Sequence, residues 1–233
     1  MDVSFFLPFY NEEAILHKNT MLLYVELKKT TQRFELVLVD DSSTDNSGAI
    51  ASALAKLPHI RYKRFSNGPS RRENLAKTFR DAKFGIVAFC DVDLSTSLKH
   101  LPRLFRNIQD GADISIGSKF MSIKPDRSIA RKAYSRTYNA SIRTLFSSRV
   151  RDHQCGFKAF RKDVLLRILD IMGYDSSMAR GWFWDAELLI RAQKLHYKIV
   201  EFPVEWKSGE KSTFSFKREL RMIPYILKLR GRL

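Results

Sequence analysis

The sequence predicts an α/β protein with a doubly wound, mostly parallel sheet, and its apolar patterning and acidic clusters support that prediction. Between residues 2 and 117, short apolar segments typical of strands alternate regularly with segments that carry helical apolar stripes. Such alternation is typical of parallel sheets with helices on both faces. Acidic residues follow two of the predicted strands, at residues 40–41 and 91–93. Because ligands of these folds bind outside the carboxyl ends of the strands, we expect a site there.

The expected elements follow one another in a regular order. Strands are expected at residues 2–7, 34–39, 59–65, 85–90 and 113–117, with helices at about 12–30, 44–57, 73–83 and 98–109. The segment 34–39 is almost entirely apolar, as in a strand that is buried on both faces. Beyond residue 119 we expect a helix at about 129–146, a strand and a helix between 152 and 169, a helix from 181, and a strand at 197–206. Pro203 indicates that this last strand lies at a sheet edge.

The composition indicates one globular domain with a short appendage, which we divide into residues 1–210 and 211–233. No apolar run is long enough to span a bilayer, and the first residues lack the basic segment of a secretory signal. Cys90 and Cys155 have no metal-binding spacing, so reduced thiols are expected. The chain carries 41 basic and 25 acidic side chains and a net charge of +16. This balance favours an anionic partner: nucleic acid, a phosphorylated substrate or an anionic membrane.

Asp91 and Asp93 end the strand that begins near Gly85. Residues two apart on an extended chain point to the same side, so both carboxylates can face one cation. Oxygen ligands of this kind suit Mg²⁺ or Mn²⁺, which commonly shares its coordination with a diphosphate. The alternative is a pair of solvated aspartates where a strand passes into a loop.

A basic segment follows at residues 119–136, where Lys119, Arg131 and further cations are opposed only by Asp126. Arg131 and Ser135 are four residues apart and share one face of the predicted helix. This face can hold an anion, or it can be a solvated basic surface.

The chain ends in residues 214–233, whose apolar side chains recur at helical spacing among lysines and arginines. Such a helix is typical of a membrane interface, where anionic lipid attracts each basic residue by about 1 kcal/mol. The alternative is a helix that docks on the core with its basic face in water.

Taken in order, these motifs resemble those of the inverting GT-A glycosyltransferases that act on polyprenyl phosphates, the family of dolichyl-phosphate mannose synthase and dolichyl-phosphate glucosyltransferase. The resemblance covers nearly the whole chain. It rests on residues 8–12, 39–45, 91–94, 119, 131, 135, 152–158 and 210–212. It implies the GT-A fold, a Rossmann-like mixed, mostly parallel sheet flanked by helices, with a C-terminal amphipathic helix.

The resemblance also implies a role for each matching residue. The nucleotide-sugar donor would be bound by Pro8, Tyr10, Glu12, Val39, Asp40, Asp41, Asp91, Val92 and Lys211. Residues 210–212, which include Lys211, resemble the family's flexible loop that closes over the donor diphosphate. Asp91 and Asp93 would hold Mg²⁺ or Mn²⁺. Lys119, Arg131 and Ser135 would hold the phosphate of a polyprenyl or dolichyl phosphate.

The chain departs from the family pattern in ways that bear on the donor. Where the family has a glycine-rich motif with a lysine, residues 67–75 read Asn-Gly-Pro-Ser-Arg-Arg-Glu-Asn-Leu. Ser95 stands where mannose synthases often carry glutamine, and residues 184–189 are more similar to the glucosyltransferase branch. A UDP-hexose donor is therefore favoured, with GDP-mannose as the other candidate.

The implied reaction transfers a hexose from the donor to the lipid phosphate with inversion at the anomeric carbon. A phosphate nucleophile is largely ionised at pH 7, so it needs positioning more than deprotonation. Asp185 stands where related sugar-acceptor enzymes carry a catalytic base; here we predict that it orients the sugar or, alternatively, caps a helix. Transfer to a sugar hydroxyl, as in polysaccharide synthesis, is the alternative reaction and would need Asp185 as a general base.

A nucleic-acid-binding module is the alternative outside enzymes, because the net charge allows it. The acidic strand ends argue against nucleic acid, since they would repel its phosphates. The resemblance instead predicts a peripheral protein on the cytoplasmic face of a membrane, with the C-terminal helix on the lipid surface. A membrane subunit is a further partner that it allows.

Overall fold

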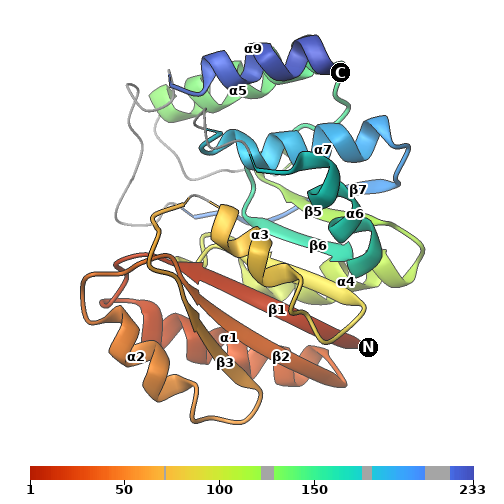
Figure 1. Cartoon of the computed structure of the whole chain (residues 1–233). Coiled ribbons are helices and arrows are strands. Elements are labelled where there is room, and N and C mark those ends of the chain that lie inside the picture. Colours follow the sequence, from red (N-terminus) through yellow and green to blue (C-terminus); the bar gives the residue numbers. More distant parts are fainter. Residues whose placement is uncertain (71, 122–128, 175–179, 208–220) are drawn as a thin grey trace.

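The computed structural model describes residues 1–70, 72–121, 129–174, 180–207 and 221–233, except for the side chains of residues 129–134 (Figure 1). The strands form one seven-stranded sheet with helices packed on both faces (Figure 1). The predicted α/β class is confirmed.

The sheet is mixed and mostly parallel, as predicted. Its strands are β1 (Asp2–Phe9), β2 (Arg33–Asp40), β3 (Ile60–Arg64), β4 (Ile86–Cys90), β5 (Ile114–Ser118), β6 (Phe157–Arg161) and β7 (Ile199–Pro203). They lie in the order β3-β2-β1-β4-β6-β5-β7. The first four pair in parallel, and β6 runs antiparallel to both of its neighbours, β4 and β5. β7, which ends at Pro203, is an edge strand, as the sequence indicates.

The helices occupy the expected segments. They are α1 (Leu16–Thr30), α2 (Ser47–Leu54), α3 (Glu73–Phe79), α4 (Leu101–Gln109), α5 (Ile129–Phe146), α6 (Lys162–Met172), α7 (Phe183–Lys194) and α9 (Ile223–Arg232). Short 3₁₀ turns, η1 (Leu98–His100) and η2 (Lys119–Met121), precede α4 and follow β5.

Each face of the sheet has its own apolar core. Phe5 and Leu7 of β1 pack with residues of α1, α2 and α4, whereas the intervening Phe6 packs with residues of α3, α6 and α7. Successive side chains on a strand point to opposite faces, so a strand covered on both faces must be apolar throughout. Each large side chain buried in this way contributes about 1.5–3 kcal/mol. The apolar segment at residues 34–39 has the same explanation in β2.

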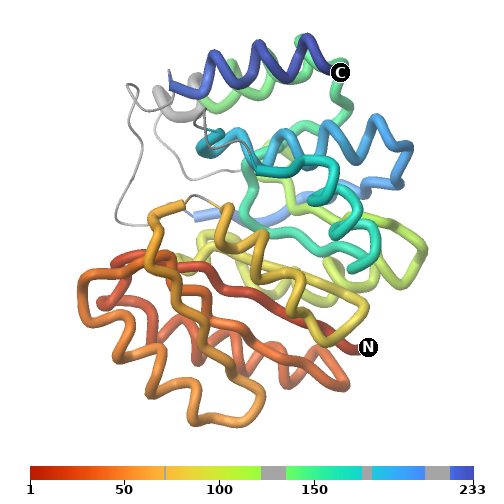
Figure 2. The backbone as a smooth tube through the Cα atoms, in the orientation of Figure 1, coloured from red at the N-terminus to blue at the C-terminus, as the bar shows by residue number. Residues whose placement is uncertain are grey.

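A third core attaches the C-terminal helix to the domain. Tyr225 and Leu229 of α9 are buried against Phe183 of α7 and residues of α5, and α9 lies beside α5 (Figure 2). The Tyr225 hydroxyl also donates a hydrogen bond to the buried Glu187, at 2.7 Å. One face of α9 is therefore docked on the core, which is the alternative that the sequence left open.

The opposite face of α9 remains in solvent. Ile223 and Leu227 are 45% and 60% exposed, although both belong to the apolar pattern of the segment. Residues 208–220, which include the beginning of that pattern, lie outside the described residues. No helix in the described part of the chain is both long and apolar enough to cross a bilayer.

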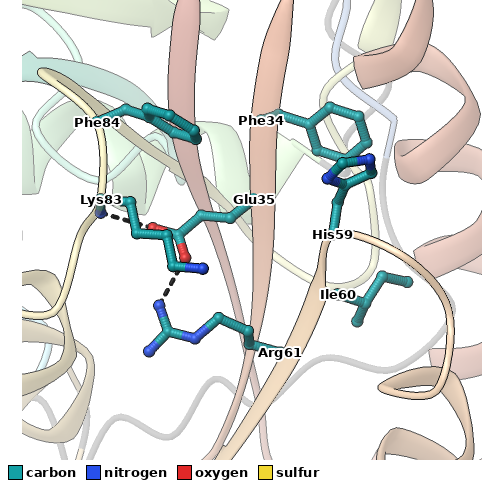
Figure 3. Close-up of a pocket in the computed structure, with 7 residues that line it drawn as sticks. All are labelled: Phe34, Glu35, His59, Ile60, Arg61, Lys83 and Phe84. Carbon is teal, nitrogen blue, oxygen red and sulfur yellow. Dashed lines mark hydrogen bonds and ion pairs between the residues drawn. The ribbon is translucent and has the colours of Figure 1, made fainter.

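A cavity of about 320 Å³ opens at the amino ends of β2 and β3 (Figure 3). Its lining residues are Phe34, Glu35, His59, Ile60, Arg61, Lys83 and Phe84. The Glu35 carboxylate accepts hydrogen bonds from the Ser4 hydroxyl (2.6 Å), the Lys83 backbone (2.7 Å) and the Arg61 guanidinium (2.6 Å). Glu35 is thus satisfied within the protein, and this cavity lies at the edge of the sheet away from the predicted site.

Candidate functional site

The predicted acidic strand ends meet where the strand order reverses. β1 pairs with β2 on one side and with β4 on the other. Phe9 at the end of β1 is in register with Asp40, and its carbonyl accepts a hydrogen bond from the Asp41 backbone at 2.9 Å. Asp91 directly follows β4. The two acidic pairs therefore flank the end of β1, at the crevice where such folds bind ligands.

The loops at this edge hold strained backbone conformations. Asn11, Ser42, Arg72 and Leu94 all have positive φ angles, and they follow β1, β2, β3 and β4 respectively. Non-glycine residues seldom adopt this conformation, and such strain concentrates at ligand sites. The carboxyl edge is therefore the best candidate for the functional site on backbone grounds also.

The predicted donor residues of the first motif line the end of β1. Pro8 is half-buried within β1, and Tyr10 is 39% exposed just beyond it. The Glu12 backbone donates a hydrogen bond to the Ser47 hydroxyl at 2.9 Å, which ties this loop to α2. Val39 is buried in the core beneath the edge.

Asp40 and Asp41 are held by different neighbours. Asp40 is fully buried and accepts hydrogen bonds from the Tyr62 hydroxyl (2.8 Å) and the Ser43 backbone (2.7 Å). Asp41 accepts hydrogen bonds from the backbone and hydroxyl of Ser70 (2.7 and 2.8 Å) and from the Asn74 amide (2.7 Å). Asp41 thus fastens the atypical segment 67–75 to the end of β2.

Asp91 and Asp93 stand at the end of β4 in unequal settings. The Asp91 side chain is 45% exposed, and its Oδ1 accepts a hydrogen bond from Arg72 Nη2 at 2.6 Å. Asp93 accepts hydrogen bonds from the backbone and hydroxyl of Ser95. Partial desolvation and the charge of Asp91 raise the pKa of Asp93 above its ordinary value. Val92, between them, is buried.

Asp185 is buried in the first turn of α7, and both of its carboxylate oxygens are engaged. Lys158 Nζ lies 2.6 Å from Oδ1, and Arg72 Nε lies 3.3 Å from Oδ2. Burial alone would raise the pKa of Asp185, but the charges and hydrogen bonds of Lys158 and Arg72 lower it below its ordinary value. Asp185 forms no capping hydrogen bond to α7, so the alternative role as a helix cap is wrong.

The charges at this edge fit a divalent cation. Asp91, Asp93 and Asp185 are opposed within their cluster by Arg72 and Lys158, which leaves one negative charge in excess. The described residues contain no group of three or more metal-ligating side chains. Mg²⁺ and related cations usually take only one or two carboxylates and complete their coordination with water and substrate phosphates. Asp91 and Asp93 match that donor set.

Lys119, predicted to bind the acceptor phosphate, is buried in an ion pair. Its Nζ lies 2.8 Å from Asp152 Oδ1, and its backbone donates to Asp152 Oδ2 at 3.0 Å. The backbone of Asp152 is held in turn, because it donates a hydrogen bond to the Glu201 carboxylate at 2.9 Å. The charge of Lys119 is therefore offset within the protein, which the sequence did not show.

Ser135 belongs to a second buried network beside this pair. The Asn139 amide donates to the Ser135 carbonyl at 2.9 Å, while its oxygen accepts from the backbone (3.0 Å) and ring (2.8 Å) of His153. The His153 ring also contacts the Ser148 hydroxyl at 2.8 Å. Burial lowers the pKa of His153 to about 4, so the imidazole is neutral at pH 7. This network joins Ser135 on α5 to the segment that holds Lys119.

Two predicted site residues cannot be placed. Lys211 lies outside the described residues, and the backbone of Arg131 lies in α5 while its side chain is outside the description. Their predicted roles remain predictions.

Sequence reasoning missed three residues that shape the site. Arg72 lies in the segment that departs from the family pattern, and Lys158 lies in a recognised motif but was given no ionic role. Gly156 is required by close packing, since a Cβ there would lie 1.9 Å from Asp91 Oδ2. The departure from the family pattern at residues 67–75 was the one available signal for Arg72.

The strand order and the acidic residues at its switch point are those of a doubly wound α/β protein whose ligands bind at the carboxyl edge of the sheet. The sequence model described as glycosyl transferase family 2 matches residues 4–169, so the chain belongs to glycosyl transferase family 2. The resemblance drawn from the sequence motifs is thereby confirmed.

Curated relatives extend this result. The glycosyltransferase AglD of Haloferax volcanii is 33% identical over 213 residues, covering 89% of this chain and 33% of AglD. The dolichyl-phosphate β-glucosyltransferase of Saccharomyces cerevisiae is 26% identical over 226 residues, covering 88% of this chain and 66% of the yeast protein. The polyprenol monophosphomannose synthase of Mycolicibacterium smegmatis is 26% identical over 211 residues, covering 88% and 77%. The chain therefore spans about a third of AglD and about two thirds of the yeast protein.

Solved structures show the same fold. Glucosyl-3-phosphoglycerate synthase of Mycobacterium tuberculosis in complex with UDP aligns with a TM-score of 0.70 and 18% identity over 99% of this chain and 80% of its own. Its complex with Mn²⁺, UDP and phosphoglyceric acid aligns equally well, with a TM-score of 0.70. The predicted GT-A fold is confirmed.

Proposed function

We propose that this protein transfers a hexose from a nucleotide-diphosphate sugar to a polyprenyl phosphate, with inversion at the anomeric carbon. Its family and the activities of its relatives support a sugar transferase that uses a lipid phosphate. A UDP-hexose is the favoured donor, on the resemblance of residues 184–189 to the glucosyltransferase branch, and GDP-mannose is the other candidate; the relatives include both a glucosyltransferase and a mannose synthase.

The observation that carries the choice of acceptor is the state of Asp185. Both of its oxygens are bound by cations, at 2.6 and 3.3 Å, and its pKa is lowered. A general base needs a free lone pair and a pKa near the working pH. Cations contact both oxygens of Asp185, and its pKa lies below its ordinary value, so Asp185 is poorly suited to take a proton from a hydroxyl acceptor. A phosphate monoester is already ionised and needs no base.

On the donor side, Asp91 and Asp93 would hold Mg²⁺ or Mn²⁺. When bound, the cation would act as a Lewis acid that neutralises charge on the departing diphosphate. Ser95 orients Asp93 through two hydrogen bonds and so supports the metal ligand. The loops after β1 and β2, with Pro8 and Tyr10, would receive the nucleotide. Lys211 would add a positive charge when its loop closes over the diphosphate.

On the acceptor side, Lys119, Arg131 and Ser135 would position the lipid phosphate. Asp152 holds the Lys119 ammonium in a fixed place, which lowers the entropy lost when the phosphate is aligned, and Asn139 bonds to the backbone carbonyl of Ser135. Because Asp152 offsets the charge of Lys119, we assign the larger share of the attraction to Arg131.

The reaction is tested with the purified chain, a panel of UDP- and GDP-hexoses, Mn²⁺, and a short polyprenyl phosphate or the matching polyprenol. We expect transfer to the phosphate and not to the alcohol. Asp185→Asn should lower kcat by less than about tenfold at saturating donor, whereas loss of a general base costs about 10²–10⁴-fold. Transfer to a hydroxyl acceptor that Asp185→Asn abolishes would contradict the proposal and favour the polysaccharide alternative.

We also propose that the protein lies peripherally on the cytoplasmic face of a membrane, with the exposed face of α9 on the lipid; a membrane subunit would add to this attachment. Ile223 and Leu227 are four residues apart and share that face, and Arg230 is exposed nearby.

Sedimentation with liposomes that contain anionic phospholipid tests this attachment. Leu227→Glu should weaken binding, because it puts a negative charge where an apolar side chain would meet the lipid. Ile171→Glu makes the same change at an exposed apolar residue of α6 and serves as the control. Equal binding by both variants would show that α9 only docks on the core.

A further inference from the structure

The atypical segment 67–75 brings Arg72 into the candidate site. Asp41 fastens this segment through Ser70 and Asn74, as described above, and Gly68 packs so closely that a Cβ would lie 2.0 Å from the Asp41 carbonyl oxygen. The chain then passes through Arg72 with φ of +82°, directly before α3. This left-handed conformation strains an arginine, so the surrounding contacts must hold it there.

The Arg72 side chain is enclosed at the carboxyl edge. Only 7% of it is exposed, and the guanidinium lies over the rings of Phe89 and Trp182, with centroid distances of 5.0 and 5.6 Å. Its Nη2 contacts Asp91 at 2.6 Å and its Nε contacts Asp185 at 3.3 Å. One guanidinium thus joins the first predicted metal ligand to the buried acid of α7.

Asp185 is itself fixed from the other side. Lys158 of β6, 1% exposed, contacts Asp185 Oδ1 and also donates to the Cys155 carbonyl, both at 2.6 Å. The groups form a row of alternating charge that runs from Lys158 through Asp185 and Arg72 to Asp91. In this row, only Asp91 is substantially exposed.

We infer that Arg72 is a positioning residue of the donor site, which holds the Asp91 carboxylate in place for the divalent cation and is anchored in turn by Asp185. This inference rests on the proposed function, because it takes Asp91 as a metal ligand. It gives Asp185 a task other than proton transfer and gives the atypical segment 67–75 a place in the site. Partners that orient a metal ligand typically account for 10–100-fold in metal affinity.

The geometry requires arginine rather than any cation. The guanidinium uses separate nitrogens for Asp91 and Asp185, and it lies over the two rings. A lysine would keep the charge but present a single ammonium, which lacks the fixed fork of the guanidinium. Arg72→Lys therefore separates positioning from charge.

The test measures Mn²⁺ binding, through the electron paramagnetic resonance signal of free Mn²⁺, without nucleotide and with UDP or GDP. Arg72→Lys should weaken Mn²⁺ binding ten- to a hundredfold. Arg80→Lys, at the other end of α3 in an exposed pair with Asp170, is the matched control and should leave it unchanged. Asp185→Asn should also weaken Mn²⁺ binding, because Asp185 anchors Arg72, which in turn holds Asp91. The double variant should be little worse than Arg72→Lys, because both act through one link.

Unchanged or tighter Mn²⁺ binding by folded Arg72→Lys would overturn the inference; tighter binding would show that Arg72 competes with the cation for Asp91. Thermal unfolding checks the fold, and if Arg72→Lys does not fold, Asp185→Asn alone decides, with unchanged affinity overturning the inference. The wild-type protein distinguishes a failure of the proposed function from a failure of the inference. If the wild-type protein binds neither nucleotide in a Mn²⁺-dependent way, the proposed function fails, and the inference that rests on it fails with it.

Discussion

Two polar clusters at the carboxyl edge differ in their charge balance and in their exposure to solvent. The donor-side cluster comprises Arg72, Asp91, Asp93, Lys158 and Asp185. Its cations are outnumbered by its carboxylates, and its last members are open to solvent: Asp91 is nearly half exposed and Asp93 is exposed. The donor-side cluster therefore has one negative charge in excess, and its exposed members are the carboxylates Asp91 and Asp93.

The acceptor-side cluster comprises Lys119, Ser135, Asn139, Asp152 and His153. All of these side chains are buried, and the charges of Lys119 and Asp152 cancel. His153 is neutral because its pKa is lowered. This cluster is closed and complete within the protein.

The difference indicates how each half can work. An open cluster with excess negative charge gains stability from a cation, so the donor side should depend on its ligand. A closed, neutral cluster has no such need and instead fixes the places of the side chains around it. We therefore expect substitutions in the acceptor-side cluster to lower the free energy of unfolding. We expect substitutions in the donor-side cluster to weaken the binding of the cation and the nucleotide.

The largest expected effect is on the acceptor side. Asp152→Asn leaves the Lys119 ammonium buried beside a neutral amide, and breaking a buried ion pair costs about 3–5 kcal/mol. Urea unfolding should show this loss, while UDP or GDP binding in Mn²⁺ remains near the wild-type value. Asp163→Asn, in the exposed pair with Arg161, is the control and should cost less than about 1 kcal/mol. Similar losses in both variants would show that the buried Lys119–Asp152 pair contributes no more to stability than an exposed ion pair.

On the donor side, we expect a smaller effect, which appears in nucleotide binding more than in stability. In Gly156→Ala, the new Cβ would lie 1.9 Å from Asp91 Oδ2, so the carboxylate must move. Calorimetry should show Mn²⁺-dependent nucleotide binding weakened by about 10–100-fold, with a smaller loss of stability than in Asp152→Asn. Gly85→Ala, whose Cβ would meet nothing within 4 Å, is the control. Nucleotide binding that survives Gly156→Ala unchanged would contradict the role of Asp91.

The sequence was sufficient for the fold because its signals are local. The apolar strands, the amphipathic helices and Pro203 each predict the element in which they lie. The alternation of strands and helices then predicts how these elements form one sheet. The position of Asp91 and Asp93 at a strand end followed from the same patterns. The antiparallel direction of β6 was not evident, since no local pattern distinguishes it.

The ion pairs within the site could not be predicted from local sequence patterns. Arg72 and Asp185 are 113 residues apart, and Lys119 and Asp152 are 33 apart, so their pairing depends on the folded arrangement. For this reason Lys119 was expected to serve as a cation for the phosphate, and its partner was missed. Asp185 was placed at the site, but its state as a bound carboxylate came only from the structure.

The smallest expected effect is a pH dependence that reports on the closed cluster. His153 has a pKa of about 4 when folded and an ordinary value of 6.5 when unfolded, because burial disfavours its charged form. The unfolded chain therefore binds the proton first as the pH falls. The contribution of His153 to stability is complete above pH 6.5 and is lost progressively toward pH 4. Between pH 7 and pH 5 this loss amounts to about 2 kcal/mol.

Urea unfolding at both pH values measures this dependence. His153→Gln should be less stable at pH 7 but should lose about 2 kcal/mol less than the wild-type protein on going to pH 5. His17→Gln, an exchange at an exposed position of α1, should leave the wild-type pH dependence in place. If His153→Gln retains the full pH dependence of stability, His153 is not held neutral by burial. The contrast between a closed acceptor-side cluster and an open donor-side cluster would then be wrong.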